Sequence, residues 1–148
     1  MKKYLIILVA ALVLFFLLFY FPNNSKTIKS VRIAGQNIKV ELAVTAEEKQ
    51  KGLSGRNNLK EDKGMLFVFE NLDNYSFWMK DMNFPIDMIW IGEDLKVIYI
   101  KKNALPESYP ESFGPEISDK NVKYVLEVVS GFSDKNNLKI GDSVLFTY

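Results

Sequence analysis

The 148-residue chain contains no cysteine and no histidine. These absences exclude disulfides, thiol chemistry, the usual zinc sites and any Ser–His or Cys–His nucleophile pair. Catalysis would have to use Asp, Glu, Lys, Tyr, Ser or Thr, and we expect no cofactor and no metal. Arginine is also scarce, since Arg32 and Arg56 are the only two among 19 basic residues. A rare arginine can mark a position that needs a rigid guanidinium fork.

The chain also lacks an excess of charge of either sign. Its 19 basic residues and 18 acidic residues give a net charge of +1. Because no basic face is evident, we expect no nucleic-acid partner. The length suits one domain of ordinary size.

A long uncharged run, residues 4–21, follows Lys2 and Lys3. As a helix it would span about 27 Å, close to the hydrocarbon thickness of a bilayer. We favour a retained single-pass membrane anchor, because the run exceeds the apolar region of a typical signal peptide and no small-x-small cleavage site follows. The alternative is secretion after signal cleavage. In the favoured interpretation the N-terminus is cytoplasmic, residues 1–25 are anchor and linker, and residues 26–148 form an extracytoplasmic domain.

The remaining sequence predicts mainly short strands. Apolar and β-branched runs, bounded by turn residues, indicate eight of them: 26–34, 37–44, 64–70, 75–80, 86–91, 95–101, 122–129 and 143–147. Thr45 and Glu48 form a capping-box pattern that predicts a short helix over 46–51, ended by Gly52. A second short helical turn is expected within 130–137. With no long helix after residue 21, we expect a mostly β (β-rich α+β) fold, a small antiparallel barrel-like domain.

One long irregular stretch, residues 103–121, carries three of the five prolines. Loops of this length inside a compact domain are commonly lids or binding loops. Because Tyr109 and Phe113 would be unusual in a disordered segment, we expect this loop to pack over something.

Several segments from about Val40 to the C-terminus resemble the domain-of-unknown-function 192 family. They are Gly52-Leu53-Ser54-Gly55-Arg56, Gly64-Met65-Leu66-Phe67-Val68-Phe69, Ser76-Phe77-Trp78-Met79-Lys80, Phe84-Pro85-Ile86-Asp87-Met88-Ile89, Tyr124-Val125-Leu126-Glu127-Val128 and Gly141-Asp142. The resemblance implies a compact β-rich barrel-like domain in exported or membrane-anchored prokaryotic proteins, and no reaction. Relatives often carry Cys in the long loop, which this chain does not.

Asp87 lies inside the apolar strand 86–91, where a carboxylate needs a partner. We expect Arg56 to be that partner, in a buried ion pair that fixes the helix against the sheet. The functional alternative is that Arg56 and Asp87 line a pocket for a polar or anionic ligand.

Glu127 alternates with Lys123, Val125 and Val129, and we expect it to face outward beside Lys123. The functional alternative pairs Glu127 with Asp87 as acid and base, in the manner of a glycoside hydrolase.

Trp78 and Lys80 share one face of their strand. We interpret Trp78 as a core residue covered by the long loop, with a sugar-stacking platform as the alternative. Lys80 has no evident partner, so any site is expected near Trp78 and Lys80, where Tyr109 and the rest of the loop could close over it.

These patterns favour a non-enzymatic, membrane-anchored domain that binds a ligand or protein partner at the cell envelope. Two alternatives stay open. One is a carboxylate-dependent hydrolase of envelope polymers. The other is a structural subunit of an envelope complex, which an exposed apolar patch near Tyr109 and Phe113 would favour.

Overall fold

The structure is a computed structural model that describes residues 2–20, 27–116 and 121–148. The elements in chain order are α1 (Lys2–Tyr20), β1 (Ser30–Ile33), β2 (Gln36–Ala43), α2 (Ala46–Lys51), β3 (Lys63–Asp73), β4 (Phe77–Trp78), β5 (Ile86–Gly92), β6 (Val97–Ala104), the 3-10 helix η1 (Pro106–Ser108), β7 (Ser112–Phe113), β8 (Val122–Val129), α3 (Phe132–Lys135) and β9 (Leu145–Thr147). The mostly β class predicted from the sequence is confirmed, with three short helices where two were expected.

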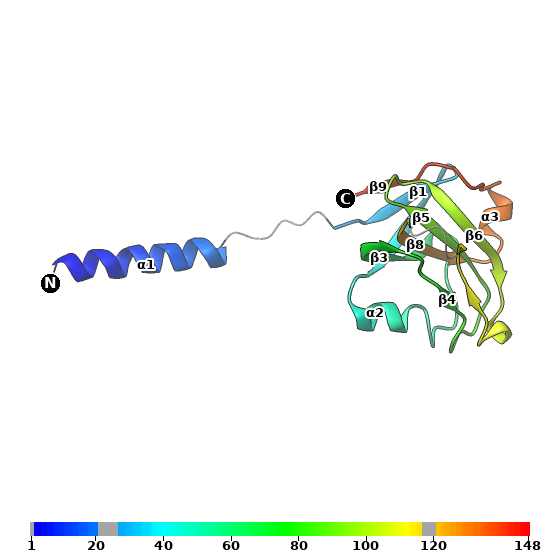
Figure 1. Cartoon of the computed structure of the whole chain (residues 1–148), viewed down its shortest axis with the longest axis horizontal. Helices are drawn as coiled ribbons and strands as arrows, with labels where there is room; N and C mark the ends of the chain where they lie inside the picture. The colour runs from blue at the N-terminus through cyan, green and yellow to red at the C-terminus, as the bar shows by residue number, and fades with distance from the viewer. Residues whose placement is uncertain (1, 21–26, 117–120) are drawn as a thin grey trace.

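Seven strands form one curled sheet in the order β6-β5-β8-β3-β2-β1-β9, shaped as a half-barrel (Figure 1). All neighbours are antiparallel except β2 and β3, which run parallel and are connected through α2. Near the two edge strands, an antiparallel bridge joins Lys96 to Ser143. The curl therefore brings the start of β6 close to the segment that leads into β9.

Apolar side chains fill both faces of this sheet. One cluster includes Phe67, Met88 and Trp90, and the other includes Leu66, Ile89 and Leu126. Every residue of β5 is buried, and this includes the carboxylate of Asp87. Strands β3, β5 and β8 at the centre of the sheet thus have no solvent face along most of their length.

Helix α2 spans Ala46–Lys51, as the capping pattern predicted. The Thr45 side chain accepts a hydrogen bond from the Glu48 N–H, and the Glu48 carboxylate accepts one from the Thr45 N–H. The long loop is partly regular: it contains η1 and β7, and β7 pairs with β4 through Phe77–Phe113 and Trp78–Ser112. The loop therefore packs over the 77–78 segment.

Among the described residues, no helix is long and apolar enough to cross a membrane. The predicted transmembrane helix is therefore not supported. The predicted linker over residues 23–25 lies outside the described residues.

Candidate functional site

A pocket of about 390 Å³ lies between α2 and β4, on one face of the curled sheet. The end of α2 and the turn that follows form one wall, and Tyr75 with β4 forms the opposite wall. The floor consists of Phe67 and Phe69 from β3 and Glu127 from β8. This volume is in the range of small-molecule sites.

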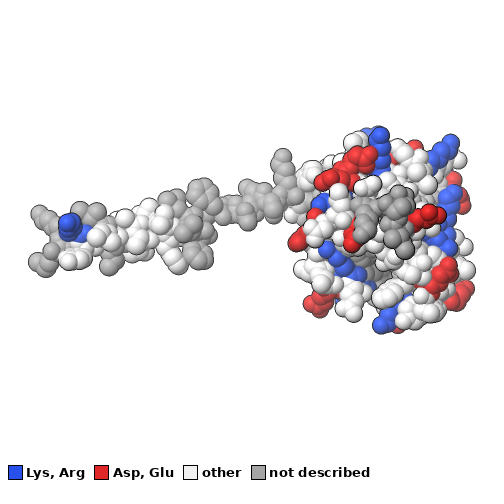
Figure 2. All heavy atoms as spheres, in the orientation of Figure 1, with Lys and Arg blue, Asp and Glu red and all other residues white. Residues whose placement is uncertain are grey.

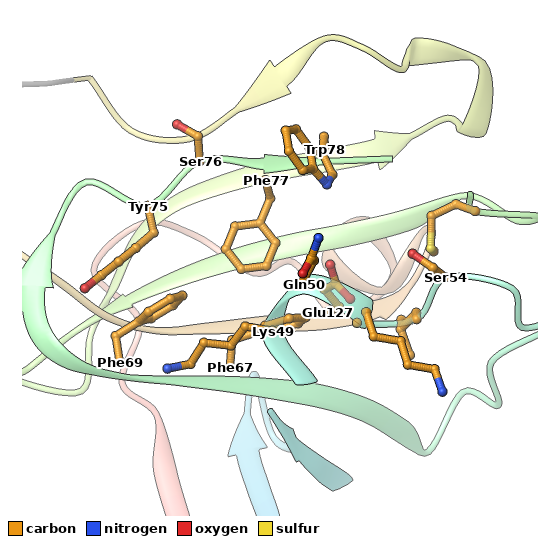
Figure 3. Close-up of a pocket in the computed structure, with 14 residues that line it drawn as sticks. Lys49, Gln50, Ser54, Phe67, Phe69, Tyr75, Ser76, Phe77, Trp78 and Glu127 are labelled. Carbon is orange, nitrogen blue, oxygen red and sulfur yellow. The ribbon is translucent and has the colours of Figure 1, made fainter. Parts of the chain in front are cut away.

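Aromatic rings dominate the pocket (Figure 3). Phe69 and Tyr75 are stacked with ring centroids 3.5 Å apart, and Phe77 meets Phe67 edge to face at 4.8 Å. The indole N–H of Trp90 donates to the Tyr75 carbonyl at 2.6 Å, which fixes that wall to the core. Such rings present apolar faces to a ligand while their positions are held by packing.

The Glu127 carboxyl lies among these rings, with Phe69, Tyr75 and Phe77 on one side of it and Ser54 on the other in Figure 3. Glu127 is only 5% exposed, and its Oε2 accepts or donates no hydrogen bond within the described parts of the chain. Burial raises the pKa of Glu127 to about 8, although the Arg56 guanidinium acts in the opposite direction. The carboxyl is therefore protonated at neutral pH, able to donate one hydrogen bond and accept others.

The expectation that Glu127 faces outward beside Lys123 is wrong. Glu127 pairs with Met88 across β8 and β5, and both side chains lie on the pocket face of the sheet. Residues 125–128 are all buried because β8 lies between β3 and β5, which are themselves covered on both faces. Alternation along one strand could not reveal this, because it does not indicate which strands are central.

The predicted ion pair between Arg56 and Asp87 is also wrong. Arg56 instead forms a bidentate pair with Glu41 on β2, at 2.8 and 2.7 Å. That pair lowers the pKa of Glu41 and raises the pKa of Arg56, chiefly through these hydrogen bonds. Arg56 also affects the pocket, because its positive charge lies close enough to Glu127 to favour the ionised form of the Glu127 carboxyl.

Asp87 is fully buried and accepts hydrogen bonds from three backbone N–H groups. Its Oδ1 accepts from Asn103 at 2.9 Å and from Gly131 at 3.2 Å, and its Oδ2 accepts from Ser133 at 2.8 Å. Asp87 pairs with Val128 in the β5–β8 register, one position from Glu127, so the two carboxyl groups face opposite sides of the sheet. They cannot act together on one substrate, and the acid–base pairing of Asp87 with Glu127 is wrong.

The turn after α2 is held against the segment after β4 by hydrogen bonds to backbone carbonyls. The Ser54 hydroxyl donates to the Lys80 carbonyl at 2.9 Å, the Gly55 N–H donates to the Asp81 carbonyl at 2.8 Å, and the Asn83 amide donates to the Arg56 carbonyl at 2.9 Å. The two walls of the pocket are thereby joined at one end.

Trp78 is 53% exposed, so its interpretation as a core residue is wrong. Its side chain lies on the opposite side of β4 from Met79, which is buried, as period-two alternation implied. Tyr109 meets Trp78 edge to face at 6.3 Å and is itself 46% exposed. Lys80 is exposed and lines a groove next to the pocket. The structure thus brings Trp78, Lys80 and Tyr109 to one area and places Glu127 in the adjoining pocket, whereas Asp87 lies elsewhere.

The comparisons with known proteins agree with this arrangement of elements. The family model DUF192, described as "Uncharacterized ACR", matches residues 29–146. This chain belongs to the DUF192 family. The match does not show whether the protein is exported or membrane-anchored, as the resemblance implied. No curated protein matches the chain.

Two solved structures share the DUF192 fold. A protein of unknown function from Novosphingobium aromaticivorans DSM 12444 is 32% identical, with a TM-score of 0.72, and the match covers 84% of this chain and 89% of that one. A protein called a "putative transcription regulator" from Sinorhizobium meliloti 1021 is 29% identical, with a TM-score of 0.73, and the match covers 84% of this chain and 98% of that one.

Sequence reasoning missed most of the aromatic lining of this DUF192 pocket. Phe67, Phe69, Tyr75 and Phe77 were expected only as strand residues, yet they surround Glu127. One signal was available: Glu127 is the single acidic residue within the apolar strand 122–129. The same burial argument that singled out Asp87 applied equally to Glu127.

Proposed function

We propose that this DUF192 protein is a non-enzymatic ligand-binding domain of the cell envelope. Its pocket takes a small, uncharged ligand that has a ring-shaped apolar face and a hydroxyl or amide group. The apolar face packs against Phe69 and Phe77, beside the buried Phe67, and the polar group meets the Glu127 carboxyl.

The observation that carries this proposal is the buried Oε2 of Glu127, which has no partner among the described residues. A buried polar atom without a hydrogen bond costs about 1–3 kcal/mol, so proteins rarely retain one without a use. Once a neighbouring side chain moves aside, a ligand group can hydrogen-bond this oxygen and remove that cost on binding. Because the carboxyl is protonated at neutral pH, it suits neutral groups that both donate and accept.

The charge of the surface is consistent with a small-molecule ligand. Figure 2 shows acidic and basic side chains intermixed on the visible face of the β domain. Such mixing creates no positive field that would attract a polyanion such as DNA to that face. The visible face therefore gives no support for a role in transcription regulation like the one named for the Sinorhizobium meliloti protein.

The envelope location is supported by the sequence alone. Residues 4–21 have no charged side chain and follow Lys2 and Lys3, the pattern expected of an anchor with a cytoplasmic N-terminus. Protease treatment of intact cells and of lysed cells, with an antibody against the C-terminus, tests this part separately. Cleavage in intact cells is expected, and protection until lysis would contradict it.

The hydrolase alternative has less support. Glu127 has a raised pKa, which suits a general acid, but the two-carboxylate mechanism requires a second carboxyl that reaches the same substrate from across the scissile bond. Asp87 lies on the other face and binds backbone N–H groups there. The structural-subunit alternative expected a broad exposed apolar patch near Tyr109 and Phe113; Tyr109 is 46% exposed, whereas Phe113 is 5% exposed.

Binding by the full chain tests the proposed function. The probe is N-acetylglucosamine, a neutral ring with hydroxyls and an acetamido group, and the readout is calorimetry together with amide chemical shifts near Glu127. Glu127→Gln keeps a donor and an acceptor and should bind within about threefold of wild type, whereas Glu127→Leu should weaken binding by about tenfold or more. Equal binding by the Leu variant would contradict the role given to Glu127, and no response to this sugar or to glucose would contradict the ligand class.

A further inference from the structure

A second groove, of about 320 Å³, adjoins the Glu127 pocket. We call it the outer groove; it is lined by Glu47, Gln50, Lys51, Ser54, Trp78, Lys80 and Asp81. Gln50, Lys51, Ser54 and Trp78 also line the Glu127 pocket. Because four side chains line both, the two hollows lie side by side along α2 and β4.

Trp78 stands at the boundary between the two hollows, and in Figure 3 it lies at the edge of the pocket beyond Phe77. Its indole is half exposed although its backbone is held in the β4–β7 pair opposite Ser112. The Tyr109 ring packs against it edge to face, with ring centroids 6.3 Å apart, and restricts its orientation. A positioned, exposed indole of this kind is a flat apolar platform that a ligand ring can cover.

The outer groove differs from the pocket in its polarity. It carries two acidic side chains, Glu47 and Asp81, and two basic ones, Lys51 and Lys80. None of the four makes an ion pair with another described residue. Their balanced charges leave donors and acceptors available for hydroxyl groups, without favouring a ligand of either net charge.

We propose that the pocket and the outer groove are two subsites of one cleft that binds a neutral glycan of at least two sugar units. The first unit enters the aromatic pocket and meets Glu127, and the second covers Trp78 and hydrogen-bonds the charged side chains of the outer groove. This inference rests on the proposed function, since it adds a second subsite and a substrate class to the same site.

Sugar rings match both halves of the cleft. Each ring has an apolar face of C–H groups and an edge of hydroxyls, so it can stack on an aromatic side chain while its edge donates and accepts hydrogen bonds. An aromatic surface lies beside polar groups twice, once at Phe77 and Glu127 and again at Trp78 and Lys80. Two consecutive sugar units of a glycan would present the same arrangement twice. A single ring could fill only one of the two hollows.

The affinity ratio between a disaccharide and its monosaccharide tests the second subsite. Chitobiose and N-acetylglucosamine, and cellobiose and glucose, are titrated into the full chain by calorimetry. We expect at least one disaccharide to bind on the order of tenfold tighter than its monosaccharide, the gain that one added aromatic contact can provide. In Trp78→Ala and in Lys80→Ala this ratio should fall to about one, whereas Tyr148→Ala, an equally exposed aromatic at the chain end, should leave the ratio at its wild-type value.

Each outcome distinguishes the two proposals. If the monosaccharides bind but the disaccharides bind no more tightly, the second subsite is wrong and the proposed function stands. If no sugar binds, both proposals are wrong. A disaccharide gain that persists in Trp78→Ala and Lys80→Ala would also overturn the two-subsite cleft. If a neutral capped trialanine peptide binds and the sugars do not, the ligand is a peptide and the glycan assignment is wrong.

Discussion

Asp87 and Glu127 lie on adjacent strands, one register position apart, yet their carboxyl groups face opposite sides of the sheet. Asp87 accepts three backbone N–H hydrogen bonds on one side, and Glu127 has a buried oxygen without a partner in the described chain on the other. Two buried acids in one sheet thus have different tasks. Asp87 satisfies donors that the fold would otherwise leave unpaired, and Glu127 presents a neutral hydrogen-bonding group to a pocket.

Replacing Glu127 should change how stability depends on pH. Its pKa in the folded protein is about 8 against an ordinary value of 4.5, so the folded state holds a proton that the unfolded state has lost between these pH values. Stability from this group is therefore complete below about pH 4.5 and is lost as pH rises toward about 8. Glu127→Gln cannot ionise and should exceed wild type by up to about 5 kcal/mol near pH 9, and by much less near pH 4.

Urea unfolding of both proteins across this pH range measures the difference, in which contributions from all other groups cancel. Glu111→Gln, at an exposed position, is the control and should follow wild type throughout. A constant difference between Glu127→Gln and wild type from pH 4 to pH 9 would show that Glu127 titrates normally.

Removing the Asp87 carboxylate should destabilise the fold strongly. Asp87→Ala leaves the N–H groups of Asn103, Gly131 and Ser133 without their acceptor in a buried place, at a cost of about 3–5 kcal/mol. Asp134→Ala is a suitable comparison, because its pair with Lys102 is largely exposed and contributes about 1 kcal/mol or less. Equal unfolding free energies for the two variants would refute the anchoring role of Asp87.

Gly52 should tolerate a side chain less well than Gly35. Both have positive φ, +48° and +75°, so alanine strains the backbone at either position. At Gly52 an added Cβ would also lie 3.2 Å from the Phe67 ring and 4.0 Å from Glu127 Oε2, whereas at Gly35 it would meet nothing within 4 Å. We expect Gly52→Ala to lose both stability and sugar affinity, and Gly35→Ala to lose only about 1 kcal/mol of stability. Calorimetric titrations that show the same affinity for both variants would contradict the placement of Gly52 at the pocket wall.

Arg56 should tune the acidity of Glu127 from a distance. The guanidinium favours the ionised carboxylate, against the larger effect of burial. Arg56→Gln should therefore raise the pKa of Glu127 above its wild-type value, while costing about 1 kcal/mol or less of stability from the exposed Glu41 pair. Arg32→Gln, at an exposed position of β1, should leave the Glu127 titration where it is; a shift of similar size in both variants would argue against a specific Arg56 effect.

Local features of the fold were predictable from the sequence because short-range rules determine them. The capping box of α2 and the apolar strand over residues 86–91 follow from residue patterns within a few positions of one another. The parallel pairing of β2 with β3 does not, because it depends on where α2 returns the chain.

The site was less predictable, because partners are chosen in three dimensions. Arg56 was expected to pair with Asp87, and only the order of strands in the sheet places Glu41 beside it. Glu127 looked like a surface residue because Lys123 precedes it at an alternating position, but the central place of β8 buries it. Trp78 was expected in the core because the long loop was expected to cover it, but the short β4–β7 pair leaves it half exposed.

The titration of the Glu127 side-chain carboxyl carbon tests the central claim most directly. Carbon-detected NMR of the full chain, with Glu127→Gln used to assign the signal, follows its chemical shift from about pH 3 to pH 10. For a buried, protonated carboxyl we expect a titration midpoint near pH 8. We also expect this midpoint to shift when N-acetylglucosamine is added at saturating concentration. A midpoint near the ordinary value of 4.5 that the sugar does not alter would contradict both the neutral carboxyl and its place in the binding site.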